Sequence, residues 1–239
     1  MKNKFVLTYI SIFLLLSASC KKLVDPGSPK DGIDAASAYR DNANSSASVT
    51  GIFSDTAIGG FSNGGVSFSI LCGLSADEYH SNFSDISKKQ LYVNALLSDN
   101  FITGQIWSEL YSNIYAANAA IEGLSSSPGV SDALKAQLMG EVRFIRAFVY
   151  FYLVNLFGDV PMPLSTDYRV NRLLPRTPAA VVYDQIVNDL KEAQSLLNDE
   201  YLTPDNKITT ERVRPNKATA TAMLARVYLY LNKWQDAEE

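Results

Sequence analysis

The sequence comprises 239 residues, of which 47% are hydrophobic, and it carries a formal net charge of -4 at pH 7. This length and apolar content allow one large or two small domains with a substantial core, which excludes an intrinsically disordered chain. Because the sequence contains no long basic run, it lacks the positively charged surface that a nucleic-acid-binding protein requires. We therefore expect a folded, acidic protein with no nucleic-acid partner.

The first twenty residues are organised like a secretory signal. Two lysines precede an apolar run over residues 5–16, and this run is too short to span a membrane. Three small residues then lead to Cys20, an order that resembles the bacterial lipobox, in which the signal is cleaved before an acylated cysteine. The strict lipobox has leucine where Ser17 stands. We expect residues 1–19 to be a signal peptide and Cys20 to be the lipid anchor; the alternative is an ordinary signal peptide that leaves Cys20 as a free thiol.

A tether and two less regular segments follow the anchor. Residues 20–34 combine prolines, glycines and charges without helical periodicity, which predicts a lipidated tether. A helix is predicted from about Ser37 to Asp55, although polar residues in its middle form helices poorly. Residues 67–98 begin with a short apolar run and then become polar with interspersed aromatics. This pattern favours a long structured surface loop, in which residues 88–97 could form one short helix.

Two long helices are predicted in the middle of the chain, over residues 103–123 and 131–161. In the second, apolar residues recur every three or four positions, and from Phe144 onward the other faces are also apolar except at Arg146 and Asn155. We interpret it as a central, buried helix, which Ser131 caps at its start and which Gly158 and Pro161 end. The connection is short, so the two helices should pack as an antiparallel hairpin. The predicted buried face of the second helix contains Leu134, Leu138, Val142, Ile145, Val149, Tyr152 and Leu156.

The rest of the chain alternates an irregular segment with further helices. Residues 162–176 show no periodicity and contain several turn formers, which predicts a surface loop. A helix is predicted over residues 177–198, with Thr177 as its hydroxyl cap before a proline, and another over residues 215–232. A further helix begins at Trp234.

The predicted helices resemble tetratricopeptide repeats. Ala147 and Phe151 stand at the spacing of that repeat and Pro161 ends the run, while residues 222–237 carry alanines and aromatics in a similar order. Residues 162–176 interrupt the period, so no clean tandem is present. The predicted fold class is all-α, with tetratricopeptide-like helical pairs and long irregular loops; the alternative is an irregular bundle with repeat-like pairs.

Few residues indicate catalysis, and we expect no enzyme activity, cofactor or metal. His80 is the only histidine, so a histidine-rich metal site is excluded by count, and no Gly-x-Ser-x-Gly motif is present. Asp77 and Glu78 are adjacent carboxylates in the polar loop. A glycosidase needs two carboxylates flanking one bond, on the order of 5–10 Å apart. A sequence cannot place such a pair in space, and nothing in this one points to one.

Aromatic residues in the polar loop are the clearer functional signal. Tyr79, Phe83 and Tyr92 lie in or beside this loop, unlike the tyrosines of the predicted helices, which we interpret as core residues. An aromatic face beside Asp and Asn donors and acceptors suits a sugar ring or a peptide. A loop that its aromatics pin to the body of the protein is an equally good interpretation.

Five stretches together resemble the SusD/RagB family of surface lipoproteins from Gram-negative bacteria. The most specific is GEVRFIRAFVYFYLVNLFGDVP, with its Arg-Ala-aromatic run and its closing turn. The five stretches are Cys20 followed by KKLVD, LSADEY at 74–79, the W-x-x-L-Y motif and its continuation at 107–122, the block at 140–161, and the block at 216–234.

The resemblance implies a non-enzymatic helical protein, with residues 35–239 as a SusD-like domain. It implies a lipid anchor in the outer membrane, facing outside, and a SusC-like TonB-dependent transporter as the partner over which the protein acts as a lid. It further implies capture of glycans, or of peptides in some members, for import. Family members are much longer, so the chain looks like the N-terminal portion of such a protein.

The resemblance also nominates ligand-binding residues. The segment after LSADE often contributes ligand contacts in the family, which points to Asp77, Tyr79, Asn82 and Phe83 here, whereas Trp107 and Tyr111 are interpreted as packing residues. Three alternatives to a glycan-capture protein stay open. They are a peptide-capturing member of the family, a secreted hydrolase that uses the loop carboxylates, and a pure interaction scaffold.

Overall fold

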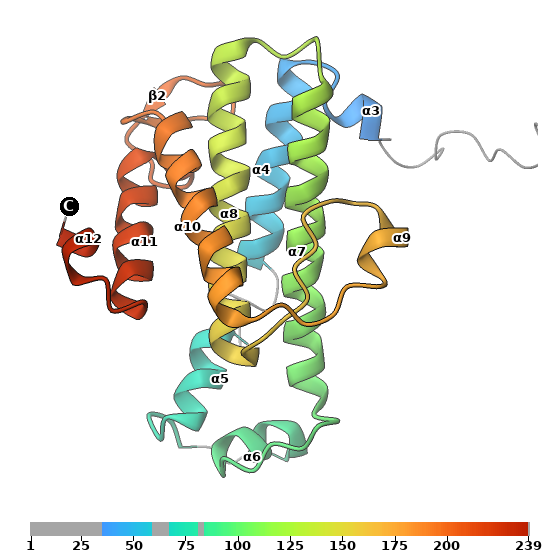
Figure 1. Ribbon diagram of the computed structural model, residues 1–239, viewed down its shortest axis with the longest axis vertical. Coiled ribbons are helices and arrows are strands. Elements are labelled where there is room, and N and C mark those ends of the chain that lie inside the picture. Colours follow the sequence, from blue (N-terminus) through green and yellow to red (C-terminus); the bar gives the residue numbers. More distant parts are fainter. Residues whose placement is uncertain (1–34, 59–66, 81–83, 239) are drawn as a thin grey trace, which may run out of the picture. The chain divides into compact units, whose positions relative to one another are not determined.

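The computed structural model describes residues 35–58, 67–80 and 84–238, and the regular secondary structure of these residues is almost entirely helical (Figure 1). The signal peptide, anchor and tether predicted over residues 1–34 lie outside the described residues. In chain order the elements are α3 (Ala35–Ala38), α4 (Asn42–Ile58), α5 (Phe68–Ser75), α6 (Ile86–Tyr92), α7 (Phe101–Ser126), α8 (Asp132–Phe157), α9 (Tyr168–Asn171), α10 (Ala179–Leu196), β1 (Tyr201–Leu202), β2 (Ile208–Thr209), α11 (Lys217–Tyr230) and α12 (Trp234–Glu238). Strands β1 and β2 form an antiparallel hairpin.

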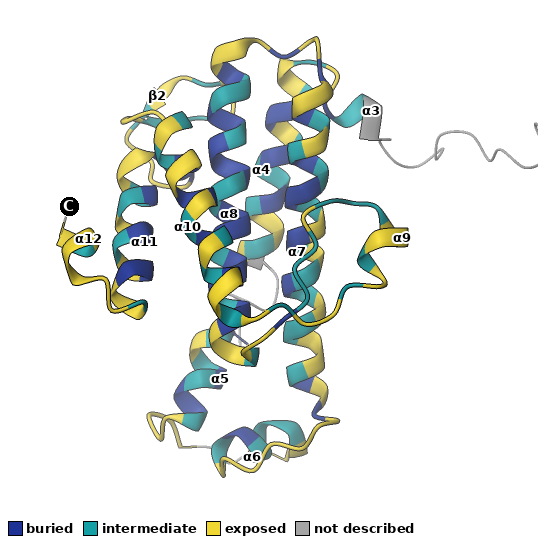
Figure 2. Cartoon of the chain, in the orientation of Figure 1, coloured by how far each residue is buried: buried dark blue, intermediate teal, exposed yellow. Residues whose placement is uncertain are grey.

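Helix α8 is the centre of the core, as predicted. It packs against α4, α7, α10 and α11, and α7 and α8 run side by side as the expected antiparallel hairpin (Figure 1). Leu138, Val142 and Ala147 are fully buried, and dark blue segments recur along α8 in Figure 2. Each such Leu or Val stabilises the fold by roughly 1.5–3 kcal/mol relative to an exposed side chain. Leu156, predicted on the same buried face, is 39% exposed because it lies in the last turn of the helix.

The all-α fold of repeat-like helix pairs is therefore confirmed. Helix α10 packs against α8 on one side and α11 on the other, and α11 packs against α12 (Figure 1). Within the residues that the structure describes, none of the helices combines the length and apolar character that a bilayer crossing requires.

A buried ion pair joins three of the central helices. The Arg146 guanidinium of α8 donates from Nε and Nη2 to the two carboxylate oxygens of Asp189 in α10, at 2.8 and 2.7 Å. Its Nη1 donates to Oδ1 of Asn118 in α7, at 2.8 Å. Asp189 is fully buried and also accepts from Arg143. A paired, fully hydrogen-bonded charge of this kind can lie in a core, whereas one partner alone could not.

A second buried pair holds the β1–β2 connection against α8. Nη2 of Arg214 donates to Glu141 Oε2 at 2.8 Å, and Gln137 Nε2 donates to Glu141 Oε1 at 2.7 Å. Arg214 also donates to the carbonyl of Thr203. Desolvation raises the pKa of Glu141 above its ordinary value, against the opposing effect of Arg214.

The segment between α8 and α10 is irregular, as predicted, but it is firmly attached. Asn118 Nδ2 and the Tyr150 hydroxyl both donate to the carbonyl of Pro163, at 2.9 and 2.8 Å, and the Tyr111 hydroxyl donates to that of Pro161 at 2.6 Å. These bonds satisfy buried polar groups of α7 and α8 with loop backbone. Only the short helix α9 departs from the loop predicted there.

Two predictions near the N-terminal side of the domain are wrong. The helix predicted over residues 37–55 is divided into α3 and α4, because Asp41 accepts from the backbone N–H of Asn44 at 2.9 Å and starts a new helix. The first part of residues 67–98 was predicted as a loop and instead contains α5, whereas the short helix predicted over residues 88–97 is present as α6, which begins at Ile86 and ends at Tyr92. These two short helices pack together around a small apolar cluster of Leu71, Leu74, Leu91 and Ile102.

Two predicted caps are also wrong, although the helix ends are close to their predicted positions. Ser131 precedes α8 but its hydroxyl makes no capping bond, and its N–H donates to Asn42 Oδ1 at 2.9 Å. Thr177 pairs with Val160 in an isolated β-bridge, and the Asp159 carboxylate accepts from the Ala179 N–H at 2.8 Å instead. The prediction for the other end of α8 is confirmed, since the helix stops at Gly158 with φ of 67°.

Candidate functional site

The nominated loop residues that the structure describes follow α5 directly. Asp77 adopts a left-handed conformation with φ of 59° and ends the helix, and the Glu78 N–H donates back to the Gly73 carbonyl at 2.9 Å. The Tyr79 ring lies over Gly73, where an added Cβ would come within 2.4 Å of Tyr79 Cε2. Tyr79 remains 48% exposed, so one part of its ring is available to a ligand.

The other two nominated residues, Asn82 and Phe83, lie outside the described residues. A ligand site made of Asp77, Tyr79, Asn82 and Phe83 therefore stays a prediction. Asp77 and Tyr79 are both exposed and lie two positions apart at the end of the same helix.

Aromatic and polar contacts also attach this loop to α6. His80 Nδ1 lies 3.1 Å from the Tyr92 hydroxyl, and the Ser75 hydroxyl donates to the Leu91 carbonyl at 3.2 Å. Asn94 Nδ2 donates to the Ser75 carbonyl at 3.1 Å. Tyr92 therefore contacts the loop at His80, as expected for this residue from the second of the two interpretations that the sequence left open for the loop aromatics.

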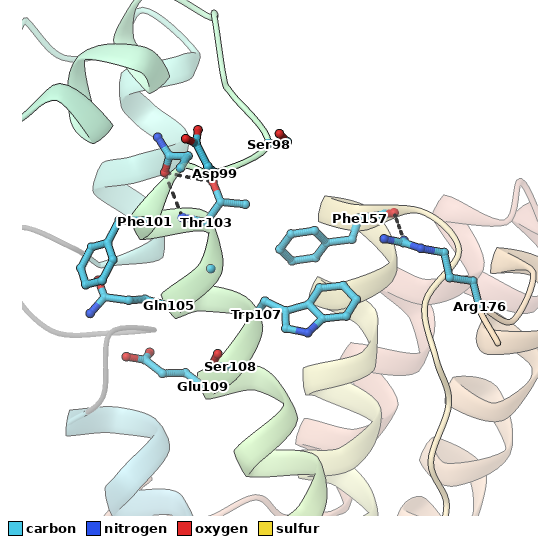
Figure 3. A pocket seen from close by; sticks show the side chains of 12 residues that line it. Ser98, Asp99, Phe101, Thr103, Gln105, Trp107, Ser108, Glu109, Phe157 and Arg176 are labelled. Carbon is cyan, nitrogen blue, oxygen red and sulfur yellow. Dashed lines mark hydrogen bonds between the residues drawn. The ribbon is translucent and has the colours of Figure 1, made fainter. Parts of the chain in front are cut away.

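A second candidate site is an open groove of about 840 Å³ along the first turns of α7 (Figure 3). Its walls come from the turn before α7, from α7 itself, from the end of α8 and from the loop that precedes α10. The lining residues are Ser98, Asp99, Asn100, Phe101, Thr103, Gly104, Gln105, Trp107, Ser108, Glu109, Phe157 and Arg176.

Trp107 and Phe157 form the aromatic part of the groove, where α7 and α8 meet. Their ring centroids lie 5.0 Å apart with an interplanar angle of 90°, and Trp107 also contacts the Tyr111 ring at 4.8 Å. Burial raises the pKa of the Tyr111 hydroxyl. Both α7 aromatics thus pack as predicted, but Trp107 is only partly buried and also lines the groove.

Arg176 completes the aromatic end of the groove. Its guanidinium carbon lies 5.6 Å from the centre of the Trp107 ring, a cation–π distance, and its Nη1 donates to the carbonyl of Asp159 at 2.5 Å. The β-bridge between Val160 and Thr177 sets this position, because it returns the chain to the end of α8 immediately after Arg176.

The opposite side of the groove is polar and partly acidic. Figure 3 shows Gln105 and Glu109 on the far side of Trp107 and Phe157 from Arg176. Asn100 starts α7 by accepting from the Thr103 N–H at 3.0 Å, and its amide donates to Gln90 Oε1 at 2.8 Å, so the turn before α7 is held to α6.

Such an arrangement suits binding better than catalysis. Aromatic faces beside amide, hydroxyl and charged groups can contact the apolar face and the hydroxyl groups of a sugar. Among residues 35–58, 67–80 and 84–238, no group of three or more His, Cys, Asp and Glu side chains is placed to hold a metal ion.

Sequence reasoning did not find the groove as a site. Trp107 was visible in a helix motif, but nothing in the linear pattern associates it with Arg176, which lies 69 positions later. The two approach because the loop between α8 and α10 is attached to α7 and α8 by buried hydrogen bonds.

The fold and the groove define a class of all-α proteins in which repeat-like helix pairs support an open, aromatic-lined surface site. Residues 42–229 match a family model, SusD-like, that is described as starch-binding associating with outer membrane. The chain therefore belongs to the SusD-like family, as the sequence motifs indicated.

Relatives and solved structures agree with this assignment. The chain is 27% identical over 99% of its length to SusD-like protein P2 of Formosa agariphila, and 28% identical over 44% of its length to the starch-binding protein SusD of Bacteroides thetaiotaomicron. It spans 45% and 17% of those proteins, respectively. A laminarin-binding SusD-like protein shares the fold, with a TM-score of 0.71 and 23% identity over 83% of this chain and 42% of the other.

Proposed function

We propose that this chain belongs to a lipid-anchored outer-membrane protein that captures glycans and delivers them to a SusC-like TonB-dependent transporter for import. The family match over residues 42–229 carries the proposal, because the family is described by starch binding and association with the outer membrane. Relatives named for starch and laminarin binding support the glycan as the ligand class. The chain spans 45% of SusD-like protein P2 and 17% of SusD. The proposed activity is therefore that of the whole protein to which this chain belongs.

The glycan is proposed to bind at the end of the domain where α5, α6 and the start of α7 lie (Figure 1). Two surfaces are available there. One is the groove with Trp107 and Phe157, and the other is the loop with Asp77 and Tyr79, for which Asn82 and Phe83 are also nominated. Aromatic rings with neighbouring polar groups support both surfaces as sugar contacts.

A direct binding measurement tests the ligand class. Isothermal titration of the protein with a panel of neutral and charged oligosaccharides, and with a panel of peptides, should give saturable binding to at least one oligosaccharide. Binding to peptides alone would favour the peptide-capturing alternative within the family. Binding to neither, with retained binding to the transporter, would favour the interaction scaffold.

A hydrolase is the alternative from another class of protein. Asp77 and Glu78 are both exposed, but they are adjacent in the chain and belong to one loop, so they are not arranged on two sides of a groove. Incubation with the same oligosaccharides should release no new reducing ends. Turnover that disappears in Asp77→Ala would overturn the non-enzymatic assignment.

The anchor and the partner require separate tests. Wild-type protein should fractionate with membranes and carry a labelled acyl chain, and Cys20→Ala should lose both properties. If Cys20→Ala kept the label, the anchor would be elsewhere. Co-purification with a TonB-dependent transporter encoded beside this protein tests the partner, and its absence under conditions that preserve other outer-membrane complexes would contradict delivery.

A further inference from the structure

We propose that the Arg176 end of the groove selects sugar units that carry an anionic group, either the carboxylate of a uronic acid or a sulfate ester. This inference rests on the proposed function, since it names the class of glycan that the groove prefers. The proposal rests on the guanidinium of Arg176, which is held beside an aromatic wall. Some of its N–H donors have no hydrogen-bond partner among the described residues.

The hydrogen bonds of Arg176 leave donors available to a ligand. Arginine has five N–H donors in a planar fork. Nη1 donates to the carbonyls of Phe157 and Asp159, whereas Nε and Nη2 have no hydrogen-bond partner among the described residues. No carboxylate in the described part of the chain lies within ion-pair distance of Arg176. Its positive charge is therefore not neutralised by an ion pair with any residue that the structure describes.

Arg176 is also held in a defined position before any ligand binds. The two backbone carbonyls lie at the end of α8, and the Trp107 ring lies below the guanidinium (Figure 3). An arginine that is already oriented loses less conformational freedom on binding than a free one, and its fork matches the geometry of a carboxylate or sulfate. Arg176 is the only basic residue that lines the groove among those that the structure describes.

The charged residues that line the groove favour one orientation of an anionic ligand. Asp99 and Glu109 repel an anionic group, and Figure 3 shows Glu109 on the far side of Trp107 from Arg176. An anionic sugar unit is thus favoured at the Arg176 end only. Trp107 and Phe157 contact the ring of that unit or the next, and the polar side with Gln105 and Ser108 accommodates neutral hydroxyl groups.

Matched oligosaccharide pairs test the proposal. Each pair shares one backbone and differs in its anionic group: oligogalacturonate with its carboxyl-reduced form, glucuronate-branched xylan oligosaccharides with their carboxyl-reduced form, and a sulfated galactan oligosaccharide with its desulfated form. We expect wild-type protein to bind the anionic member on the order of tenfold more tightly, the gain typical of a charge-assisted hydrogen-bonded contact. The uronic acid and sulfate pairs show which of the two groups is preferred.

Substitution of Arg176 assigns the preference to this residue. Arg176→Gln should abolish the preference for the anionic member while binding of the neutral member stays within about twofold. Arg176→Lys keeps the charge without the planar fork and should retain part of the preference. Arg172→Gln is the matched control, because it removes an exposed arginine of the same loop that does not line the groove. Thermal unfolding of each variant identifies any loss of folding.

The outcomes separate this inference from the proposed function. Equal or tighter binding of the neutral members by wild-type protein would overturn the anionic preference and leave glycan capture intact. A preference that persists in Arg176→Gln, or is lost equally in Arg172→Gln, would show that the groove arginine does not produce it. Binding of another oligosaccharide of the wider panel but of no member of these pairs would overturn this inference alone, whereas binding of no oligosaccharide at all would overturn both proposals.

Discussion

Arg146 and Arg214 lie in the interior of the helical domain, whereas Arg176 lies at the surface groove. Each interior arginine meets a fully buried carboxylate, Asp189 or Glu141, through two N–H donors. Arg176 meets two backbone carbonyls and an aromatic ring instead. Arginine side chains thus join elements of the core in one region, whereas in the other the arginine presents N–H donors that have no partner among the described residues.

This difference separates the residues that maintain the scaffold from those that can serve a ligand. An interior arginine is costly to remove because its partner is left as an unpaired buried charge. A groove arginine leaves no buried charge behind, so its removal should affect binding more than folding. The four predictions below test this separation, beginning with the largest expected effect.

Arg146→Leu should cause the largest loss of stability. It leaves Asp189 in the core with only the longer contact from Arg143, at 3.1 Å, and it removes the bond to Asn118. We expect the free energy of unfolding, measured with urea, to fall by on the order of 3 kcal/mol. Where the variant is still folded, its relative affinity for different glycans should match that of wild type.

The partly exposed Arg143 provides a control on the same helix. Arg143→Leu leaves the two-donor contact between Arg146 and Asp189 intact and should cost much less. A stable Arg146→Leu protein that had selectively lost ligand binding would contradict the scaffold role.

Trp107→Ala should affect both regions, because Trp107 packs between α7 and α8 and also lines the groove. Loss of its contacts with Phe157 and Tyr111 should reduce stability by about 1–3 kcal/mol, and loss of a sugar-stacking surface should weaken glycan binding roughly tenfold. Unfolding and titration of the same preparation measure the two effects. Tyr115 is an exposed aromatic residue of α7 outside the groove, so Tyr115→Ala should change neither stability nor glycan affinity. Unaltered affinity in Trp107→Ala would show that the groove is not the glycan site.

The scaffold was predictable from the sequence because its signals are local. Apolar spacing located α8, and Gly158 marked its end through a backbone conformation that glycine adopts readily. The buried position of Asp189 was not apparent, since a carboxylate on a helix is usually solvated; Arg146 in an otherwise apolar stretch was the available sign that a buried partner exists.

The site was much harder to predict, for two physical reasons. Helices α5 and α6 have only eight and seven residues, too few for a clear apolar period, and their stability comes from packing on each other and on the start of α7. The groove forms only when the bridge between Val160 and Thr177 brings Arg176 to Phe157, which is a tertiary effect. The nominated loop residues followed from family resemblance, and they remain a prediction.

Tyr79→Ala distinguishes the two proposed glycan surfaces. Tyr79 lies half-exposed over Gly73 and makes no ion pair, so stability should change by less than about 1 kcal/mol. If the loop contacts the glycan, affinity should fall several-fold, and the fall should add to that of Trp107→Ala in the double variant. Tyr168→Ala, on exposed α9, controls for the loss of a surface tyrosine. Unchanged affinity in Tyr79→Ala would assign the loop to a structural role and leave the groove as the sugar-contacting surface.

The smallest effect is expected at the exposed ion pair of the β1–β2 turn, where Lys207 Nζ lies 2.5 Å from Asp205 Oδ2. Hydrogen bonds from Lys207 and then Thr203 lower the pKa of Asp205 to about 2, from an ordinary value of 3.8. A carboxyl group whose pKa is lowered by folding stabilises the folded state above its ordinary pKa, and this contribution is lost as the pH falls from about 4 towards 2. NMR titration of the Asp205 carboxyl should show the low value, and Lys207→Met should return it towards 3.8, with little change in unfolding at pH 7 because solvent screens exposed pairs. A loss of stability in Lys207→Met as large as that of Arg146→Leu would show that burial does not distinguish the ion pairs of this fold, and the separation between scaffold and surface arginines would then lose its physical basis.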